Sequence, residues 1–123
     1  MQDVQDLQSR FCLAVALHVK PERRNAFLAA MRADQAGALS SEAACAAYLF
    51  GEDVNVPNTF HMFEQYLSRD GFAEHSKTAH YGSWAAFKAT EPFSASATVS
   101  YFKTIEPSVL RGVGGGVVAP DAV

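Results

Sequence analysis

A strand–loop–strand unit in the middle of the chain limits the folds that are open to it. Residues 43–50 (AACAAYLF) could form a helix by their alanine content, but the next eight residues, GEDVNVPN, carry the Gly, Asp, Asn and Pro of a hairpin loop. Beyond that loop, residues 59–66 (TFHMFEQY) alternate between two sets of side chains, which is typical of a strand. The unit is therefore predicted to be a β-hairpin.

The segments on either side of this hairpin predict an α+β fold. Phe11–Val19 is apolar and bounded by polar residues, so it is predicted to be a strand, and a helix is expected from about residue 21 to 36, with Gly37 as its stop. A second helix is expected over residues 68–88, capped by its first serine, and a fourth strand over residues 95–105. The order β-α-β-β-α-β indicates a ferredoxin-like fold, with both helices on one face of a four-stranded antiparallel sheet.

Length and composition favour one domain. A chain of 123 residues has room for a single core, which we place at residues 11–107. Residues 1–10 form a polar N-terminal segment and residues 108–123 a Gly-rich C-terminal tail. No helix is predicted after the glycines, so the tail does not resemble a phosphate-binding loop.

Charge and hydropathy exclude several classes of partner. The net charge of −3 gives no positive field for nucleic acid, and no apolar run reaches the roughly 20 residues that cross a membrane. The first ten residues are polar, so a cytoplasmic protein is expected. Cys12 and Cys45 lie in apolar stretches without metal-type spacing and are predicted to be structural thiols.

Residues 15–103 resemble the antibiotic biosynthesis monooxygenase family. The phrase VALHVKPERRNAFLAAMR is similar to its opening strand, turn and first helix, and FHMFEQYLSRDGFAEHSKTAHYGSWAAF is similar to its most recognisable block. The spacing from Glu64 to His75 and on to His80 is the strongest part of the match. Members commonly have Glu-Pro-Gly-Cys before the second strand, where this chain has Glu-Ala-Ala-Cys at 42–45. The resemblance implies a dimeric α/β barrel with a cavity between sheet and helices.

The family resemblance leaves three functions open. The leading hypothesis is an enzyme, a homodimeric monooxygenase that oxygenates a quinol or polyketide-type aromatic with no metal, flavin or other cofactor. The alternatives are an isomerase or tautomerase acting on a small signal molecule, with or without a phosphate group, and a non-enzymatic dimeric module that binds a small molecule. A haem-degrading branch uses an Asn on the first strand, which this chain lacks.

His80, His75 and Glu64 are the candidate catalytic residues. A histidine has an ordinary pKa near 6.5 and suits the removal of a substrate proton at neutral pH. On an unbroken helix His75 and His80 would point about 140° apart, so no metal site is predicted, although a break near Thr78 would change this. Glu64 is interpreted as a catalytic carboxylate or a structural anchor, with His75 as its expected partner.

Aromatic side chains are the candidate substrate-binding residues. A slot for a planar ring is expected from Tyr81, Trp84, Tyr66 and Phe60, all of which could equally be core residues. Asn58 in the hairpin loop could polarise a substrate carbonyl, or could serve the turn alone. His61 is expected on the opposite sheet face, where a dimer would pack. Cations expected to meet a phosphorylated substrate are Lys77, Arg69 and Lys103.

Overall fold

The computed structural model describes residues 9–105 of the chain and confirms the predicted ferredoxin-like α+β architecture. One antiparallel sheet has the strand order β2-β3-β1-β4. The strands are β1 (Phe11–Val19), β2 (Cys45–Glu52), β3 (Thr59–Tyr66) and β4 (Phe93–Lys103). The hairpin prediction is therefore confirmed, and β1 has the predicted bounds.

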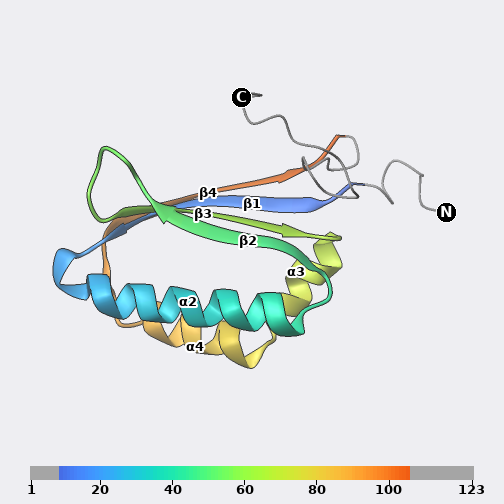
Figure 1. The fold of residues 1–123 in the computed structure, drawn as a ribbon, viewed down its shortest axis with the longest axis horizontal. Helices are drawn as coiled ribbons and strands as arrows, with labels where there is room; N and C mark the ends of the chain where they lie inside the picture. The colour runs from blue at the N-terminus through green and yellow to red at the C-terminus, as the bar shows by residue number, and fades with distance from the viewer. Residues whose placement is uncertain (1–8, 106–123) are drawn as a thin grey trace, which may run out of the picture.

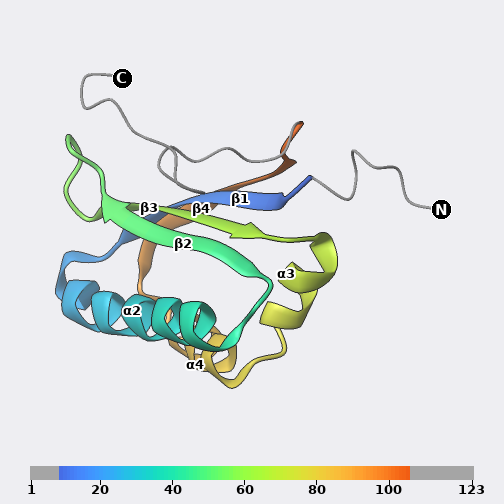
Figure 2. The same cartoon turned by 45° about the vertical axis from the view of Figure 1, so that its right-hand side comes forward.

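The helices lie on one face of this sheet. A short 3-10 helix η1 (Pro21–Arg23) leads into α2 (Arg24–Ser41), and α3 (Arg69–His75) and α4 (Ala79–Lys88) follow the hairpin. Both views show α2 and α4 side by side beneath the sheet, with α3 at one end (Figure 1 and Figure 2). Among residues 9–105, no helix lies on the opposite face of the sheet (Figure 1).

The hydrophobic core lies between α2 and the sheet. The Phe27 ring of α2 lies 4.6 Å from the Phe60 ring of β3 and 6.0 Å from the Trp84 ring of α4, measured between centroids. Phe27 and Met31 are fully buried, and Phe60 is 2% exposed. These contacts fix the distance between the helix layer and the sheet, and they make Phe60 a core residue.

The predicted second helix is two helices. α3 ends at His75, and α4 starts after Thr78, whose hydroxyl accepts a hydrogen bond from the Tyr81 N–H at 3.2 Å. The same hydroxyl donates to the His75 carbonyl at 2.7 Å, so Thr78 joins the two helix ends. The prediction of one continuous helix was wrong, because this threonine caps a new helix where periodicity suggested none. The predicted cap Ser68 is confirmed by its bond to the Gly71 N–H.

The sequence predicts that the first helix stops at Gly37. This prediction was wrong, because α2 continues through Gly37 to Ser41. A Cβ atom at Gly37 would lie 2.4 Å from Cγ of His80, a distance that real Cβ atoms do not show. The missing side chain therefore lets the His80 ring of α4 pack against the α2 backbone. The glycine serves close helix approach rather than helix termination.

Three sequence expectations concern other parts of the chain. Most of the N-terminal segment 1–10 and all of the tail 108–123 lie outside the described residues. Cys12 and Cys45 are free thiols, and burial raises the pKa of Cys45 to about 11, in keeping with structural thiols. Between residues 9 and 105 there is no helix with the length and apolarity that a membrane crossing requires.

The contact at Gly37 predicts that alanine substitutions at Gly37 and Gly82 change the free energy of unfolding in opposite directions. Gly37→Ala is expected to lower the free energy of unfolding by about 1–3 kcal/mol, because the new methyl group forces α2 and α4 apart. Gly82→Ala in α4 meets no atom within 4 Å and is expected to raise it by about 0.5–1 kcal/mol. Urea unfolding of both variants measures this, and equal effects of the two changes would contradict the close packing.

Candidate active site

A cavity of about 190 Å³ lies between the sheet and the helices. Leu13, Val15 and Met62 form its wall on the sheet, and Tyr81 and Trp84 of α4 form the wall on the helix side. The other lining residues include three ionisable side chains at one end, Asp34, Glu64 and His75. An apolar cavity with a few convergent polar groups is the usual form of a small-molecule site.

His75, the last residue of α3, is the centre of the polar end. It is 2% exposed, and its Nδ1 is hydrogen-bonded to Oε2 of Glu42 at 2.6 Å. Its other ring nitrogen, Nε2, lies 3.5 Å from Oδ2 of Asp34 and 4.0 Å from Oε1 of Glu64. The helix end thus places one imidazole among three carboxylates that come from α2, its C-cap and β3.

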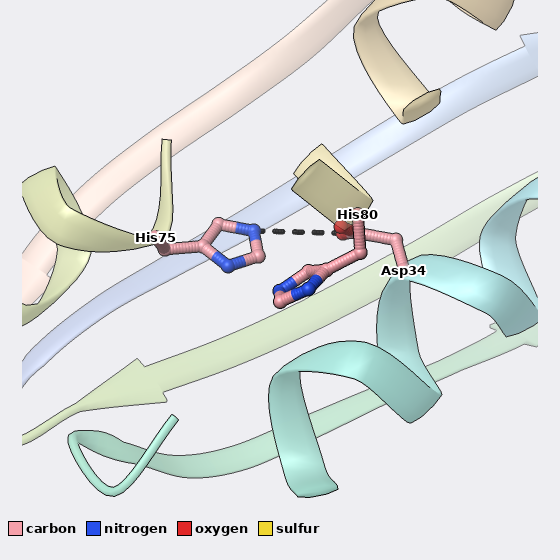
Figure 3. A group of neighbouring side chains, drawn as sticks. All are labelled: Asp34, His75 and His80. Atoms are coloured by element: carbon pink, nitrogen blue, oxygen red, sulfur yellow. Dashed lines mark ion pairs between the residues drawn. The ribbon is translucent and has the colours of Figure 1, made fainter. Parts of the chain in front are cut away.

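His80 reaches the same cluster from α4. Its Nε2 forms a short hydrogen bond with Oε2 of Glu42, the same oxygen that binds His75. The His75 and His80 ring centroids are 5.5 Å apart, and Figure 3 shows both rings and Asp34 converging from three separate elements. His80 is not among the residues that line the cavity. It therefore contacts the cavity groups through Glu42.

One carboxylate oxygen of Asp34 has no hydrogen-bond partner among the described residues. Its Oδ2 accepts a hydrogen bond from the Tyr48 hydroxyl at 2.6 Å, but its Oδ1 has no partner within the described part of the chain. Asp34 is only 2% exposed. An unsatisfied buried acceptor costs about 1–3 kcal/mol. Asp34 therefore carries a buried acceptor whose hydrogen-bonding capacity is not used by the described residues.

Glu64 is held by a neighbouring tyrosine on β3. The Tyr66 hydroxyl donates a 2.6 Å hydrogen bond to Oε1 of Glu64, which is shorter than the 4.0 Å separation from the expected partner His75. Burial raises the pKa of Glu64, although the Tyr66 bond and the nearby His75 oppose this. Glu64 is therefore both anchored and more basic than an exposed glutamate.

The surrounding carboxylates set the charge of His75. Burial lowers the pKa of its imidazole, but hydrogen bonds to Asp34 and Glu42 and their negative charges outweigh burial and raise the pKa to about 9. His75 is therefore an imidazolium at neutral pH, a donor rather than a free base. This differs from the expectation that a neutral His75 removes a substrate proton.

Two of the predicted aromatic residues line the cavity and two do not. Tyr81 and Trp84 are lining residues, whereas Phe60 and Tyr66 are buried in the layer behind it. Asn58 lies in the hairpin loop with a φ of 65°, and its side-chain oxygen accepts a 2.9 Å hydrogen bond from Arg24. It is not a lining residue, and its geometry is that of a turn.

The sequence interpretation missed Asp34 and Glu42 as functional residues. Asp34 follows Phe27 and Met31 on the buried face of α2, so an acid at a core position was the available signal. Glu42 occupies the first position of the phrase that corresponds to Glu-Pro-Gly-Cys in the family. It is the C-cap residue of α2, which brings its carboxylate to both histidines.

Asp34, His75 and His80 could also hold a metal ion. Each offers one ligand atom, and these atoms lie within 4.8 Å of one another (Figure 3). We had expected the two histidines to point apart on an unbroken helix, but the break before α4 removes that geometric objection. The same side chains therefore suit proton transfer and metal binding, so any activity assay needs a chelator control.

Solved structures from three bacteria share the fold. A Caulobacter crescentus CB15 protein, named among the antibiotic biosynthesis monooxygenases, has a TM-score of 0.74 and 18% identity, over 81% of this chain and 93% of its own. Rv0793 from Mycobacterium tuberculosis has a TM-score of 0.68 and 22% identity over 76% and 92%. A conserved protein of unknown function from Bacteroides thetaiotaomicron VPI-5482 has a TM-score of 0.69 and 25% identity over 79% and 99%.

Sequence comparison agrees with these structural similarities. No functionally curated protein matches the chain significantly. The family model described as antibiotic biosynthesis monooxygenase matches residues 10–86, which is more than half of the 123 residues and includes Asp34, Glu42, Glu64, His75 and His80. The match and the shared fold together show that this chain belongs to the antibiotic biosynthesis monooxygenase family.

Proposed function

We propose that this protein is an enzyme that oxygenates a compact hydroxylated aromatic, of quinol or polyketide type, without a metal or flavin. The observation that carries the proposal is the pairing, in one apolar cavity, of a charged imidazole with two buried carboxylates. His75 supplies the positive charge, and Asp34 and Glu64 supply the carboxylates. A substrate hydroxyl at this end of the cavity would lie beside all three side chains.

The chemistry needs an electron-rich anion next to oxygen. In the proposed reaction a substrate proton passes to a carboxylate at the polar end, either Asp34 or Glu64. The His75 imidazolium, 3.5 Å from Asp34, stabilises the anion that forms. Oxygen adds to a ring carbon that carries hydrogen, and the hydroperoxide loses water to leave a carbonyl. One oxygen atom ends in the product and the other in water, so no external reductant is required.

His80 has a positioning role in this scheme. It binds Glu42, and the same Glu42 oxygen orients His75 and helps to hold its charge. Loss of His80 would leave the cavity lining in place but would loosen the carboxylate behind His75. We therefore assign the direct contact with the substrate anion to His75 and the indirect support to His80.

Oxygen uptake with a panel of quinols and anthrone-like phenols tests this assignment. His75→Asn is expected to lower kcat about 100-fold, because it removes a charged donor from the developing anion. His80→Asn is expected to lower it about tenfold, through displacement of Glu42. The control is His61→Asn, since His61 pairs with Asp53 outside the cavity and should leave the rate unchanged.

Chelator treatment addresses the alternative use of the cluster. EDTA-dialysed protein is expected to keep its full rate of oxygen uptake. A rate that falls on dialysis and returns with added zinc or manganese would contradict the metal-free proposal.

Unchanged kcat in His75→Asn, with folding confirmed by thermal unfolding, would contradict the role of His75.

An isomerase or tautomerase is the second candidate. It is favoured by the 3.5 Å separation of an imidazolium and a carboxylate, a pair that can give and take protons without oxygen. Turnover under strictly anaerobic conditions would favour this function over oxygenation. Absence of both activities would leave a small-molecule-binding role for the cavity.

The pKa of His75 predicts how stability depends on pH. Its folded-state pKa of about 9 lies above the ordinary value of 6.5, so its contribution is complete below pH 6.5 and disappears as pH rises through about 9. The free energy of unfolding is expected to fall by an amount on the order of 3 kcal/mol over this range. Urea unfolding of the wild type and of His75→Gln measures it, and an equally steep fall in the variant would refute it.

We further propose that a second copy of the chain covers the outer face of the sheet. The pairing of β1 with its neighbours puts Phe63 and Phe102 on this face, with ring centroids 6.3 Å apart, and Phe102 is 47% exposed. Leu49 on the same face is 56% exposed. Contiguous exposed apolar side chains of this kind are typical of an interface.

Sedimentation velocity tests the homodimer. The wild type is expected to sediment as a dimer, and Phe102→Asp to shift to the monomer, because a carboxylate would be buried in the apolar interface. Val54→Asp is the control, since Val54 is 96% exposed in the hairpin loop. A monomeric wild type at micromolar concentration would overturn the proposal.

A further inference from the structure

The residues that line the cavity differ in charge and in exposure. Asp34 and Glu64 are 2% and 5% exposed. Lys88, the last residue of α4, also lines the cavity but is exposed to solvent. The lining therefore combines buried carboxylates with an exposed cation.

Lys88 extends across the aromatic wall of the cavity. Its Nζ lies 5.6 Å from the ring centroid of Tyr81 and 5.8 Å from that of Trp84. The helix dipole favours a basic residue in the last turn, which accounts for the charge of Lys88. It does not account for the direction of the side chain, because α4 could equally present this ammonium group to open solvent.

The ammonium group of Lys88 forms no ion pair with the described residues. By contrast, Lys77 pairs with Glu74 at 3.1 Å and Arg24 pairs with Glu52 at 2.6 Å. A cation that rests on two aromatic faces in the cavity lining can accept an anion without breaking an existing salt bridge.

The volume of the cavity limits the size of the ligand. An engineered apolar cavity of about 150 Å³ in another protein takes up benzene. A cavity of about 190 Å³ therefore accommodates one aromatic ring with small substituents. Trp84 and Met62 on opposite walls would enclose the ring, with one edge toward His75 and the other toward Lys88.

We propose that the cavity selects a single-ring hydroxylated aromatic whose second substituent is an anion, and that Lys88 is the specificity residue for that anion. The hydroxyl end of this ligand rests on the proposed function; the anionic end rests on Lys88 alone. An anionic group at the inner end would face Asp34 and Glu64, so the charge also fixes the orientation of the ring. A carboxylate and a phosphate share the required chemistry.

Lys88 takes the place of the cations that we expected from the sequence. Lys77 is paired with Glu74, and the Arg69 guanidinium lies over the Phe11 ring at 5.2 Å. Neither these two residues nor Lys103 line this cavity. Lys88 was overlooked because it stands at the end of an amphipathic helix, where a lysine is ordinarily a solvated cap.

The single tryptophan provides the measurement. Trp84 is the only tryptophan of the chain and lines the cavity, so quenching of its fluorescence reports occupancy. The probes are 4-hydroxybenzoate, its neutral isostere 4-hydroxybenzamide, and 4-hydroxyphenyl phosphate. The wild type is expected to bind the benzoate about fivefold more tightly than the amide. A stronger preference for the phosphate would identify phosphate as the anionic group.

Two lysine variants make the result specific. Lys88→Met keeps the apolar stem on the aromatic rings and is expected to bind acid and amide equally, whereas Lys77→Met should keep the wild-type preference. Equal affinities in the wild type, a preference that survives in Lys88→Met, or no quenching by any probe would each overturn the proposal. Because binding needs no turnover, a failure to consume oxygen would refute the oxygenation proposal separately.

Discussion

The rest of the structure depends on the contacts between the buried imidazole of His75 and the carboxylates around it. The His75 ring nitrogens face Glu42 at 2.6 Å and Asp34 at 3.5 Å, so one side chain joins the end of α3 to α2 and to the C-cap residue of α2. Carboxylates buried to this degree require a compensating charge, and removal of one partner leaves the others costly. The imidazolium provides that charge and links α2 and α3 to Glu64 of β3.

This cluster also decides what chemistry the cavity can perform. A neutral histidine would have been a base, but Asp34 and Glu42 keep His75 protonated, with a pKa of about 9. The groups able to accept a proton are then the carboxylates, and Asp34 has an oxygen without a partner in the described structure. A positive donor beside a negative acceptor suits a substrate that becomes an anion, which is the requirement common to oxygenation and tautomerisation.

The two faces of the sheet have different surroundings in this member of the antibiotic biosynthesis monooxygenase family. On the inner face, β1 and β3 contribute apolar wall and one carboxylate to the cavity. On the outer face, the partly exposed rings of Phe63 and Phe102 form the surface on which we propose that a second copy of the chain packs. The alternation of side chains along each strand lets one sheet serve both purposes.

The sequence alone determined the order of elements, the hairpin, β1 and the cap at Ser68, because local periodicity and turn residues act over a few positions. It also predicted Glu64, His75 and Trp84 as site residues, and these three side chains line the same cavity. The break before α4 is also local, because Thr78 caps the new helix. Only the tertiary structure decided that α2 continues through Gly37 and that Asp34 and Glu42 converge on His75. These depend on how closely two helices pack and on which charges burial leaves together, and neither is a property of a local stretch of sequence.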